Sequence, residues 1–215
     1  FPKMFMNTFV IAIFTCIIST IFVLSVAYSM SRMRFKMRKP FMNIAMIIGL
    51  FPSFMSMIAV YYILRALNLA DGAMIRVALI IVFSAGSGAG FYVAKGFFDT
   101  ISKSLDEAAI IDGATRWNVF TKITVPLSKP IIVYTILTSF MGPWVDFIFG
   151  KVICRADAQY YTVSIGLWKM LEKEYIDSWY TFFAAGAVVV SIPIAILFLM
   201  TQKFYVEGMT GAVKG

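Results

Sequence analysis

Five long apolar stretches constrain this chain more than any other feature of its sequence. They cover residues 7–30, 41–64, 75–98, 131–148 and 181–204. Each one reaches the roughly 18 to 20 residues that a helix needs to cross a bilayer. In lipid, only helices and closed barrels satisfy their backbone polar groups, and the alternating pattern of barrel strands is absent here. The sequence therefore predicts an all-α, polytopic transmembrane helical bundle.

Composition supports the same fold class. Hydrophobic residues make up 60% of the 215 residues, and the mean hydropathy is +0.85. An average soluble domain contains only about 45–50% apolar residues, so a water-soluble fold could not bury this excess. We expect the lipid bilayer to surround much of the chain, and residues 1–215 to form a single transmembrane domain.

Basic residues between the apolar stretches predict the orientation of the chain. Connector 65–74 carries only Arg65, whereas connector 31–40 carries five basic residues: Arg32, Arg34, Lys36, Arg38 and Lys39. Because Lys and Arg concentrate in cytoplasmic loops, we expect the 31–40 connector inside. Alternation then places residues 95–130 inside, the outer loop 150–180 outside and the tail 203–215 in the cytoplasm. The same bias explains the net charge of +8 without a nucleic-acid partner.

The start of the chain predicts one further helix. Five crossings leave residue 1 outside, yet Phe1 is followed by neither the basic region nor the small-residue cleavage site of a signal peptide. We therefore expect five visible helices of a six-helix bundle, with the first helix absent from this sequence.

Residues that carry catalysis or hold cofactors are scarce. The chain has no His, and its two cysteines, Cys16 and Cys154, are far apart, so neither a metal ligand set nor a disulfide framework is expected. The small-residue run 84–90 lacks the Lys-Ser or Lys-Thr of a phosphate-binding loop. It serves either close helix packing or a bend around a pathway. We expect this chain to bind no cofactor, metal or ATP.

The connector between the third and fourth apolar stretches has its own helical pattern, over residues 104–126. Ser104 can cap a helix whose first turn holds Asp106 and Glu107, where negative charge suits the helix dipole. Gly113 supplies a permissive backbone for a turn, and a second short helix can run over 114–121 until Pro126 stops it. The sequence thus predicts a helix-turn-helix at the cytoplasmic surface.

Apolar side chains in this connector are too many for a solvated loop. They are Ala109, Ile110, Trp117, Phe120 and Ile123. Either the membrane surface or another protein is expected to cover them.

A specific resemblance runs through the same residues. The order is E-A-A, three residues, G, nine residues, then I-x-L-P, and it is matched by Glu107, Ala108, Ala109, Gly113, Ile123 and Pro126, with Val125 in the place of Leu. This pattern resembles the signature of the membrane subunits of binding-protein-dependent ABC importers, which implies a MetI-like permease fold. In that family the segment is a coupling helix held in a cleft of the ATPase subunit. The resemblance implies nine ATPase-coupling residues: Glu107, Ala108, Ala109, Asp112, Gly113, Trp117, Phe120, Ile123 and Pro126.

The C-terminal segment 202–215 narrows the resemblance. It looks like the tail of maltose and maltodextrin importer permeases of the MalG type, in which the last residues reach into the ATPase dimer interface. By that resemblance the ATPase-contacting residues are Glu207, Gly208, Thr210 and Lys214. A frayed, Gly-rich end is the alternative.

The segment 140–148 resembles the end of the fifth helix in these carbohydrate permeases. Gly142 and Pro143 are expected to kink or break the helix, Trp144 to prefer the membrane interface, and Asp146 is an acid near membrane depth. These residues act either as a helix-end anchor or along the sugar pathway.

The resemblance implies a transport subunit of an ATP-driven sugar importer in the bacterial cytoplasmic (inner) membrane, with a maltodextrin-like substrate. It also implies three partners: a second homologous permease, a dimer of ABC ATPase subunits and an extracytoplasmic sugar-binding protein that meets the outer loop. An ion channel or an intramembrane enzyme is the alternative. It is disfavoured because the sequence has no His, no evident pair of intramembrane acids and no repeat that resembles an ion filter.

Overall fold

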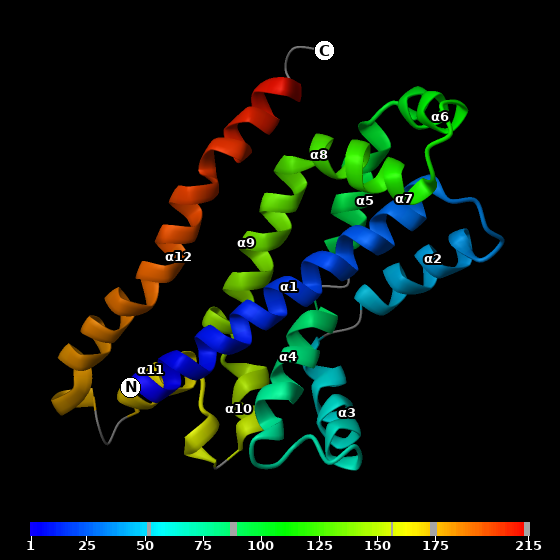
Figure 1. The fold of residues 1–215 in the computed structure, drawn as a ribbon. Coiled ribbons are helices and arrows are strands. Elements are labelled where there is room, and N and C mark those ends of the chain that lie inside the picture. Colours follow the sequence, from blue (N-terminus) through cyan, green and yellow to red (C-terminus); the bar gives the residue numbers. More distant parts are fainter. Residues whose placement is uncertain (51–52, 87–89, 156, 173–175, 213–215) are drawn as a thin grey trace.

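The computed structural model describes residues 1–50, 53–86, 90–155, 157–172 and 176–212, and every regular element among them is a helix (Figure 1). The all-α prediction is confirmed. In chain order the elements are α1 Pro2–Arg32, α2 Arg38–Gly49, α3 Ser53–Ala66, α4 Met74–Gly86, α5 Gly90–Thr100, α6 Lys103–Ile111, α7 Arg116–Val119, the π-helix η2 Phe120–Thr124, α8 Val125–Leu127, α9 Lys129–Val145, α10 Ile148–Cys154, the 3-10 helix η3 Ala158–Tyr160, α11 Val163–Met170 and α12 Ile176–Ala212.

The helices run between two ends of the molecule (Figure 1). The upper end holds the connector 33–37, the helices α6 to α8 and the last turns of α12. The lower end holds the N-terminus, the connector 67–73, α10 and α11. The basic connector and the 104–126 segment therefore lie at the same end, and Arg32 makes an ion pair with Asp106 there.

Helix α1 lies at the centre and packs against α9, α5 and α4. It contains Pro only at its first position and no Gly, so nothing in its sequence interrupts 31 residues of helix. The packed face carries small side chains that let neighbouring helices approach closely: Thr8, Ala12, Thr15, Ser19 and Ala27. The opposite face is apolar and exposed, as a lipid-facing surface would be: Ile17, Ile18, Ile21 and Phe22.

Two helices, α1 and residues 177–204 of α12, are each long and apolar enough to cross a membrane. Two further spans are possible if bent pairs count as one: α4 with α5, bent by 43°, and residues 116–127 with α9, bent by 82°. The expected stretches 7–30 and 181–204 lie entirely within α1 and α12.

The stretch 41–64 is not one helix, and this expectation was wrong. Helix α2 ends at Gly49 and α3 begins at Ser53, with residues 51 and 52 outside the described residues. Gly49 and Pro52 are both poor helix formers, which opposes a continuous helix here. Every residue of α2 is exposed or half-buried, so this helix lies at the side of the bundle rather than inside it.

The stretches 75–98 and 131–148 also differ from expectation. Residues 87–89 of the small-residue run lie outside the described residues, and the helices on either side of them, α4 and α5, meet at an angle. Helix α9 ends at Val145, three residues early, because the backbone of Asp146 is extended, with ψ 123°.

Polar side chains fasten the lower end of α1 to the outer loop. The side-chain amide of Asn7 donates to the carbonyls of Gln159 and Tyr161, at 3.0 and 3.2 Å. The hydroxyl of Thr8 accepts from the backbone N–H of Val163 at 2.8 Å. These bonds satisfy backbone groups of Gln159, Tyr161 and Val163, so this part of loop 150–180 is tied to α1.

We expect Ala12→Leu to destabilise the chain by about 1–3 kcal/mol, because Ala12 is fully buried beside Phe140 and Trp144 and the added carbons have no space. Thermal unfolding of the detergent-purified chain measures the loss. Ser25→Leu adds similar bulk at an exposed position of the same helix and is the control. Equal melting temperatures for the two variants would contradict the close packing of α1.

Candidate functional site

The first helix of the 104–126 segment begins two residues earlier than predicted. The cap of α6 is Ser102, whose hydroxyl oxygen accepts from the backbone N–H of Ser104 at 3.3 Å. The prediction of Ser104 as the cap was wrong, because a capping side chain bonds an N–H two or three residues later and must precede the first turn. Ser104 lies within the helix and pairs with the Ser102 hydroxyl at 2.7 Å.

The turn after α6 depends on Gly113, as expected. Its φ is +85°, a left-handed conformation that side chains with a Cβ disfavour. The N–H groups of Gly113 and Ala114 bond the carbonyls of Ile110 and Ala109, which closes the end of α6. Thr115 then caps α7 by accepting from the N–H of Asn118 at 3.2 Å. The two short helices fold back on each other.

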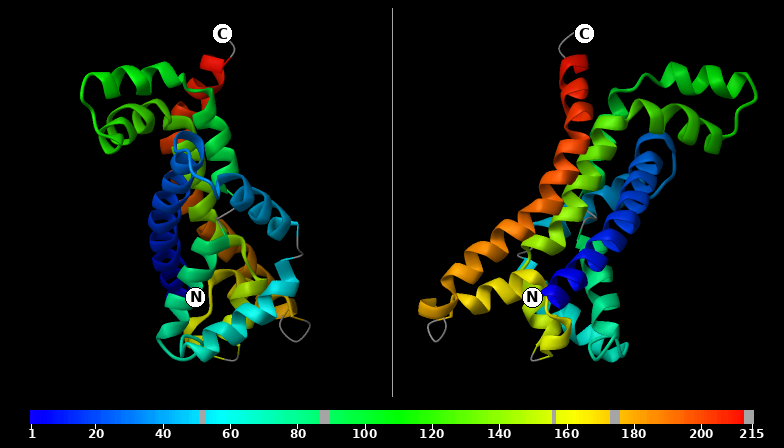
Figure 2. Two further views of the ribbon diagram at one scale, coloured as in Figure 1. Left: turned by 90° about the vertical axis from the view of Figure 1, so that its right-hand side faces the viewer. Right: turned by 60° about the vertical axis from the view of Figure 1, so that its left-hand side comes forward.

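The second helix does not stop at Pro126. Helix α7 passes into the π-helix η2 and then into α8, and Pro126 lies in the first turn of α8. Pro126 therefore lies inside a continuous run of helical residues and does not end it. The sharp bend, 82°, falls between Leu127 and Lys129. Helices α6 to α8 project sideways from the upper end of the bundle (Figure 2).

Apolar side chains stand out from the projecting segment. The exposed fraction is 85% for Ile111 and 69% for Trp117, and Ile110 and Leu127 are also exposed. Ile111 was missed in the sequence, although neighbouring residues of a helix point about 100° apart, so Ile110 and Ile111 could not share one buried face. Glu107, Ala108 and Asp112 are exposed as well, and Ala109 and Ile123 are half-buried.

Phe120 faces the bundle rather than a partner. Its ring packs on that of Tyr28, with 4.7 Å between centroids, and its other neighbour is Trp117 at 5.8 Å. The sequence placed Phe120 among the uncovered apolar residues. The structure shows instead that α1 covers much of it, a tertiary contact that local pattern cannot reveal.

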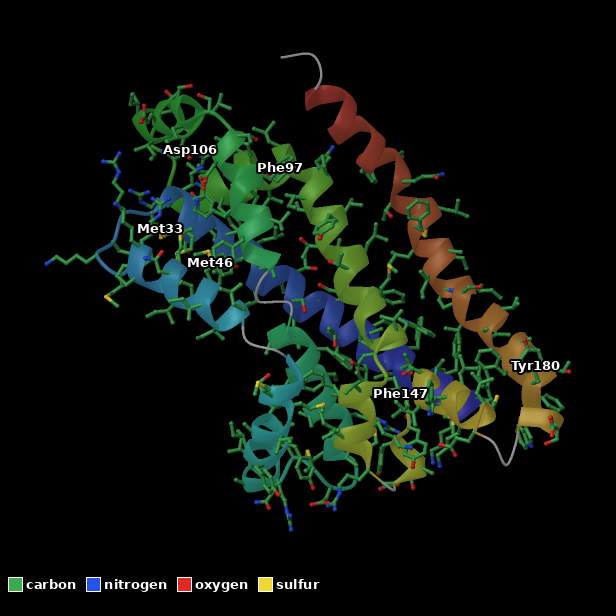
Figure 3. All side chains as sticks on the ribbon, turned by 180° about the vertical axis from the view of Figure 1, so that it is seen from behind. Met33, Met46, Phe97, Asp106, Phe147 and Tyr180 are labelled. Atoms are coloured by element: carbon green, nitrogen blue, oxygen red, sulfur yellow. The ribbon has the colours of Figure 1, made fainter. Side chains whose placement is uncertain are left out.

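The inner side of the segment is fixed to α1 by polar contacts. Arg32 Nε lies 3.0 Å from Asp106 Oδ2, and Arg32 Nη2 donates to the carbonyl of Ile101 at 2.9 Å. The hydroxyl of Tyr28 donates to the carbonyl of Arg116 at 3.2 Å. Figure 3 shows Asp106 at the same end as Met33 and Phe97, opposite Phe147 and Tyr180. Sequence reasoning used Arg32 only as a basic residue of a connector.

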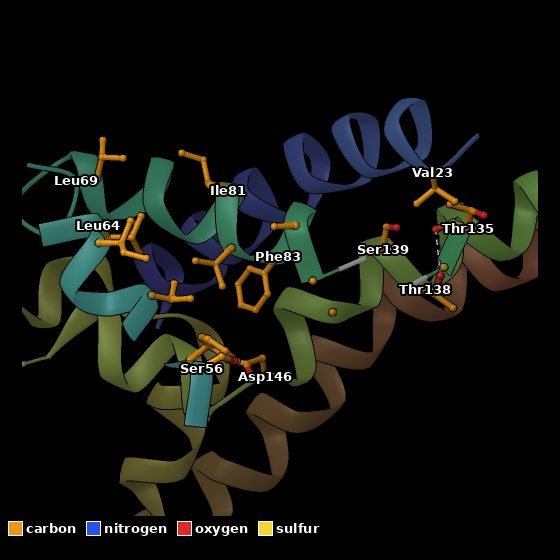
Figure 4. Close-up of a pocket in the computed structure, with 18 of the residues that line it drawn as sticks. Val23, Ser56, Leu64, Leu69, Ile81, Phe83, Thr135, Thr138, Ser139 and Asp146 are labelled. Atoms are coloured by element: carbon orange, nitrogen blue, oxygen red, sulfur yellow. Dashed lines mark hydrogen bonds between the residues drawn. The ribbon is translucent and has the colours of Figure 1, made fainter. Parts of the chain in front are cut away.

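A cavity of about 800 Å³ opens between α3, α4 and α9 (Figure 4). Aliphatic side chains make most of its wall. One face of α9 supplies a polar stripe of Thr135, Thr138 and Ser139, followed by Gly142, spaced by three or four residues as helix geometry requires; Asp146 lines the cavity just beyond the end of α9. Among the described residues, no three His, Cys, Asp or Glu side chains gather to hold a metal.

The four residues 142, 143, 144 and 146 divide between two places. Gly142 and Asp146 line the cavity, and Asp146 Oδ2 also accepts from the N–H of Gly150 at 2.9 Å, in the first turn of α10. Pro143 does not break α9, because the helix continues to Val145. Trp144 is only 2% exposed and packs on Phe5, so it is a core residue and not a membrane-interface anchor.

The C-terminal tail is helical as far as Ala212. Its Glu207, Gly208 and Thr210 lie on this helix, and their side chains are outside the described part of the structure, as is all of Lys214.

The thiol of Cys154 is unsuited to nucleophilic chemistry. Burial, aided by the charge of Asp157, raises its pKa to about 12, so it stays protonated at neutral pH. Its Sγ donates to the carbonyl of Tyr160 at 3.3 Å, which makes it a packing residue.

Comparison with known proteins now identifies the family. Residues 20–206 match the family described as "Binding-protein-dependent transport system inner membrane component". The chain belongs to this family. A crystal structure of a bacterial ABC transporter involved in the import of the acidic polysaccharide alginate contains a similar chain: the TM-score is 0.78 and the identity 26%, over 95% of this chain and 75% of that chain. The family resemblance and the MetI-like permease fold are confirmed.

Named relatives are permeases of oligosaccharide transport systems. The galactooligosaccharides permease GanQ of Bacillus subtilis is 35% identical over 217 residues, which cover 100% of this chain and 75% of GanQ. The maltodextrin permease MalD of Streptococcus pneumoniae is 32% identical over 98% of this chain and 74% of its own length. The maltose/maltodextrin permease MalG of Escherichia coli is 33% identical over 88% of this chain and 64% of its own length.

We expect Asp146→Ala to lower stability by about 1 kcal/mol, because it removes the acceptor of the Gly150 N–H in the first turn of α10. Asp146→Asn keeps an oxygen acceptor and should stay near the parent. Thermal unfolding measures the stability of both variants. Equal losses of stability in the two would contradict this role of the Asp146 carboxylate.

Proposed function

We propose that this chain is a transmembrane permease subunit of an ATP-driven importer for a sugar, and that it takes up energy through residues 104–126. The observation that carries the proposal is the projecting segment α6 to α8, which exposes Ile111 and Trp117 while its inner side is fixed to α1. Exposed apolar side chains on a short, well-anchored element suit a docked protein partner. Family membership supports an ATPase subunit as that partner.

The relatives and the cavity support the proposed substrate class. GanQ and MalD belong by name to transport systems for galactooligosaccharides and maltodextrin. The polar stripe on α9 offers hydroxyl groups to sugar hydroxyls, and Asp146 beyond the end of α9 offers a carboxylate, beside an aliphatic wall. We infer that the cavity is this chain's half of a pathway completed by a second, homologous permease, and that the substrate is a maltodextrin-like oligosaccharide.

The orientation proposed from charge agrees with this arrangement. Five basic residues lie in connector 31–40, beside the projecting segment, which favours the cytoplasm for the upper end. The ATPase dimer and the C-terminus of α12 then share that side, and a sugar-binding protein would meet α10 and α11 at the other. Neither an ion channel nor an intramembrane enzyme gains support from the family match.

The first test of the proposal concerns the exposed tryptophan. We expect Trp117→Ala to weaken association with the ATPase subunit by roughly tenfold or more, because a large exposed aromatic often dominates such an interface. Copurification and sugar-stimulated ATP hydrolysis of the assembled transporter measure the effect. Gly113→Pro and Glu107→Lys should lower the stimulated hydrolysis as well, with membrane insertion intact.

The matched control is Trp179→Ala, which removes another exposed tryptophan at the opposite end of the molecule. Its ATPase copurification should equal that of the parent. The coupling role of residues 104–126 is wrong if Trp117, Gly113 and Glu107 variants all keep parent-level coupling.

A second test concerns the tail. Deleting residues 207–215 should weaken ATPase association or activity, because the helix of α12 extends to Ala212 and could reach a partner at the upper end. The truncated chain, assembled with its partners, is compared with the full chain by copurification and hydrolysis. An undisturbed complex would favour a frayed end.

A further inference from the structure

We propose that α1 is a strut that carries movement of the projecting segment α6 to α8, here called the coupling segment, to the outer loop, with Arg32 and Asp106 as the positioning residues at its cytoplasmic end. This inference rests on the proposed function, since the coupling segment is the part that the ATPase would move. It concerns residues outside the family signature, because Arg32 lies in α1 and Asp106 precedes the E-A-A residues.

Two buried side chains of opposite charge, Arg32 and Asp106, join the end of α1 to the start of α6. Arg32 is the last residue of α1, and Asp106 lies in the first turn of α6. Their side chains are only 3% and 12% exposed, and Nε lies 3.0 Å from Oδ2. Attraction between charges is much stronger at such a buried site than at a surface. A shift of α6 therefore cannot leave the end of α1 in place without separating two buried charges.

The Arg32–Asp106 ion pair is poorly suited to mere stabilisation of the fold. Within the described residues, Arg32 Nη1 and Asp106 Oδ1 are buried and lack hydrogen-bond partners. A buried ion pair with unsatisfied atoms gains little over apolar side chains of similar size, and its best-attested role is to fix register. The pair is thus better explained by the position it imposes than by the stability it adds.

Neighbouring contacts also hold the end of α1 beside α5 and α6. Arg32 Nη2 also bonds the carbonyl of Ile101, and Ser31 donates to Asp99 Oδ1 at 2.6 Å. Asp99 pairs in turn with Lys95 on α5. The end of α1 is therefore joined both to the coupling segment and to the helix that leads into it, so these elements move together.

The far end of α1 is fixed as well. The helix runs without Gly or internal Pro from the coupling segment to the lower end, where Asn7 and Thr8 hold residues 159–163 of the outer loop. A continuous helix fixed at both ends transmits displacement as a rigid body. Movement at α6 would thus reach the side on which a sugar-binding protein docks.

Single variants in the assembled transporter test the link. We expect Arg32→Gln and Asp106→Asn to lower sugar uptake per ATP hydrolysed by roughly 2- to 30-fold, the range expected for loss of a coupling contact. ATPase copurification should stay at the parent level, because the exposed face of the segment is unchanged. Arg34→Gln is the matched control: it makes the same change at an exposed position of the same connector.

Two double variants separate positioning from stability. The exchange Arg32→Asp with Asp106→Arg should restore coupling, because the attraction returns. The apolar pair Arg32→Met with Asp106→Leu should restore the yield of folded protein and leave coupling low. If the apolar pair restores coupling as fully as the exchange, the contact is only structural and the proposal is wrong.

Further variants separate a failure of the strut from a failure of the proposed permease function. If a single variant does not assemble, Arg32→Lys keeps the charge but loses the planar guanidinium, and we expect it to assemble with intermediate coupling. Asn7→Ala, at the far end of α1, should lower coupling with ATPase copurification unchanged. Parent-like coupling in Arg32→Gln and Asn7→Ala, together with a loss in Trp117→Ala, overturns the strut and leaves the permease function intact.

Discussion

The requirement that every backbone polar group be hydrogen-bonded in lipid governs this structure. It explains why all described elements are helices, and it also locates the exceptions, since non-helical backbone needs protein partners of its own. The outer loop shows this directly: the carbonyls of Gln159 and Tyr161 are bonded by Asn7, and the N–H of Val163 by Thr8. Helix α1 thus satisfies backbone far away in sequence, as well as packing the bundle.

The same requirement explains which parts of the fold were predictable. Residues 7–30 are apolar and contain no Gly or Pro, residues 181–204 contain only Gly186 and Pro193 as interior breakers, and both stretches fall within single helices. Residues 41–64 are also mostly apolar, but Gly49 and Pro52 oppose helix in the middle of this stretch. A window average cannot register two residues whose effect is on backbone geometry. The end of α9 before Asp146 was not predicted for a related reason. There the Asp146 carboxylate accepts from the N–H of Gly150 in α10, a contact that hydropathy does not register.

The candidate site divides along the same line. Gly113 was predictable because a left-handed turn is a local property, and Trp117 because its ring had no partner in the pattern. Phe120, Trp144 and Arg32 were not, because their surroundings come from distant segments: Tyr28 for Phe120, Phe5 for Trp144 and Asp106 for Arg32. Nothing in a basic connector distinguishes the one arginine that turns inward from its solvated neighbours.

The two sides of the projecting segment α6 to α8 have opposite chemistry, and this division suits the proposed role of a part that receives force. Its outer side is apolar around Ile111 and Trp117, so a partner can dock by burying area without requiring one exact geometry. Its inner side is charged and hydrogen-bonded at Asp106 and Arg116, so its position on α1 is tightly specified. Docking that tolerates small shifts, joined to an attachment that does not, passes displacement inward instead of absorbing it at the surface.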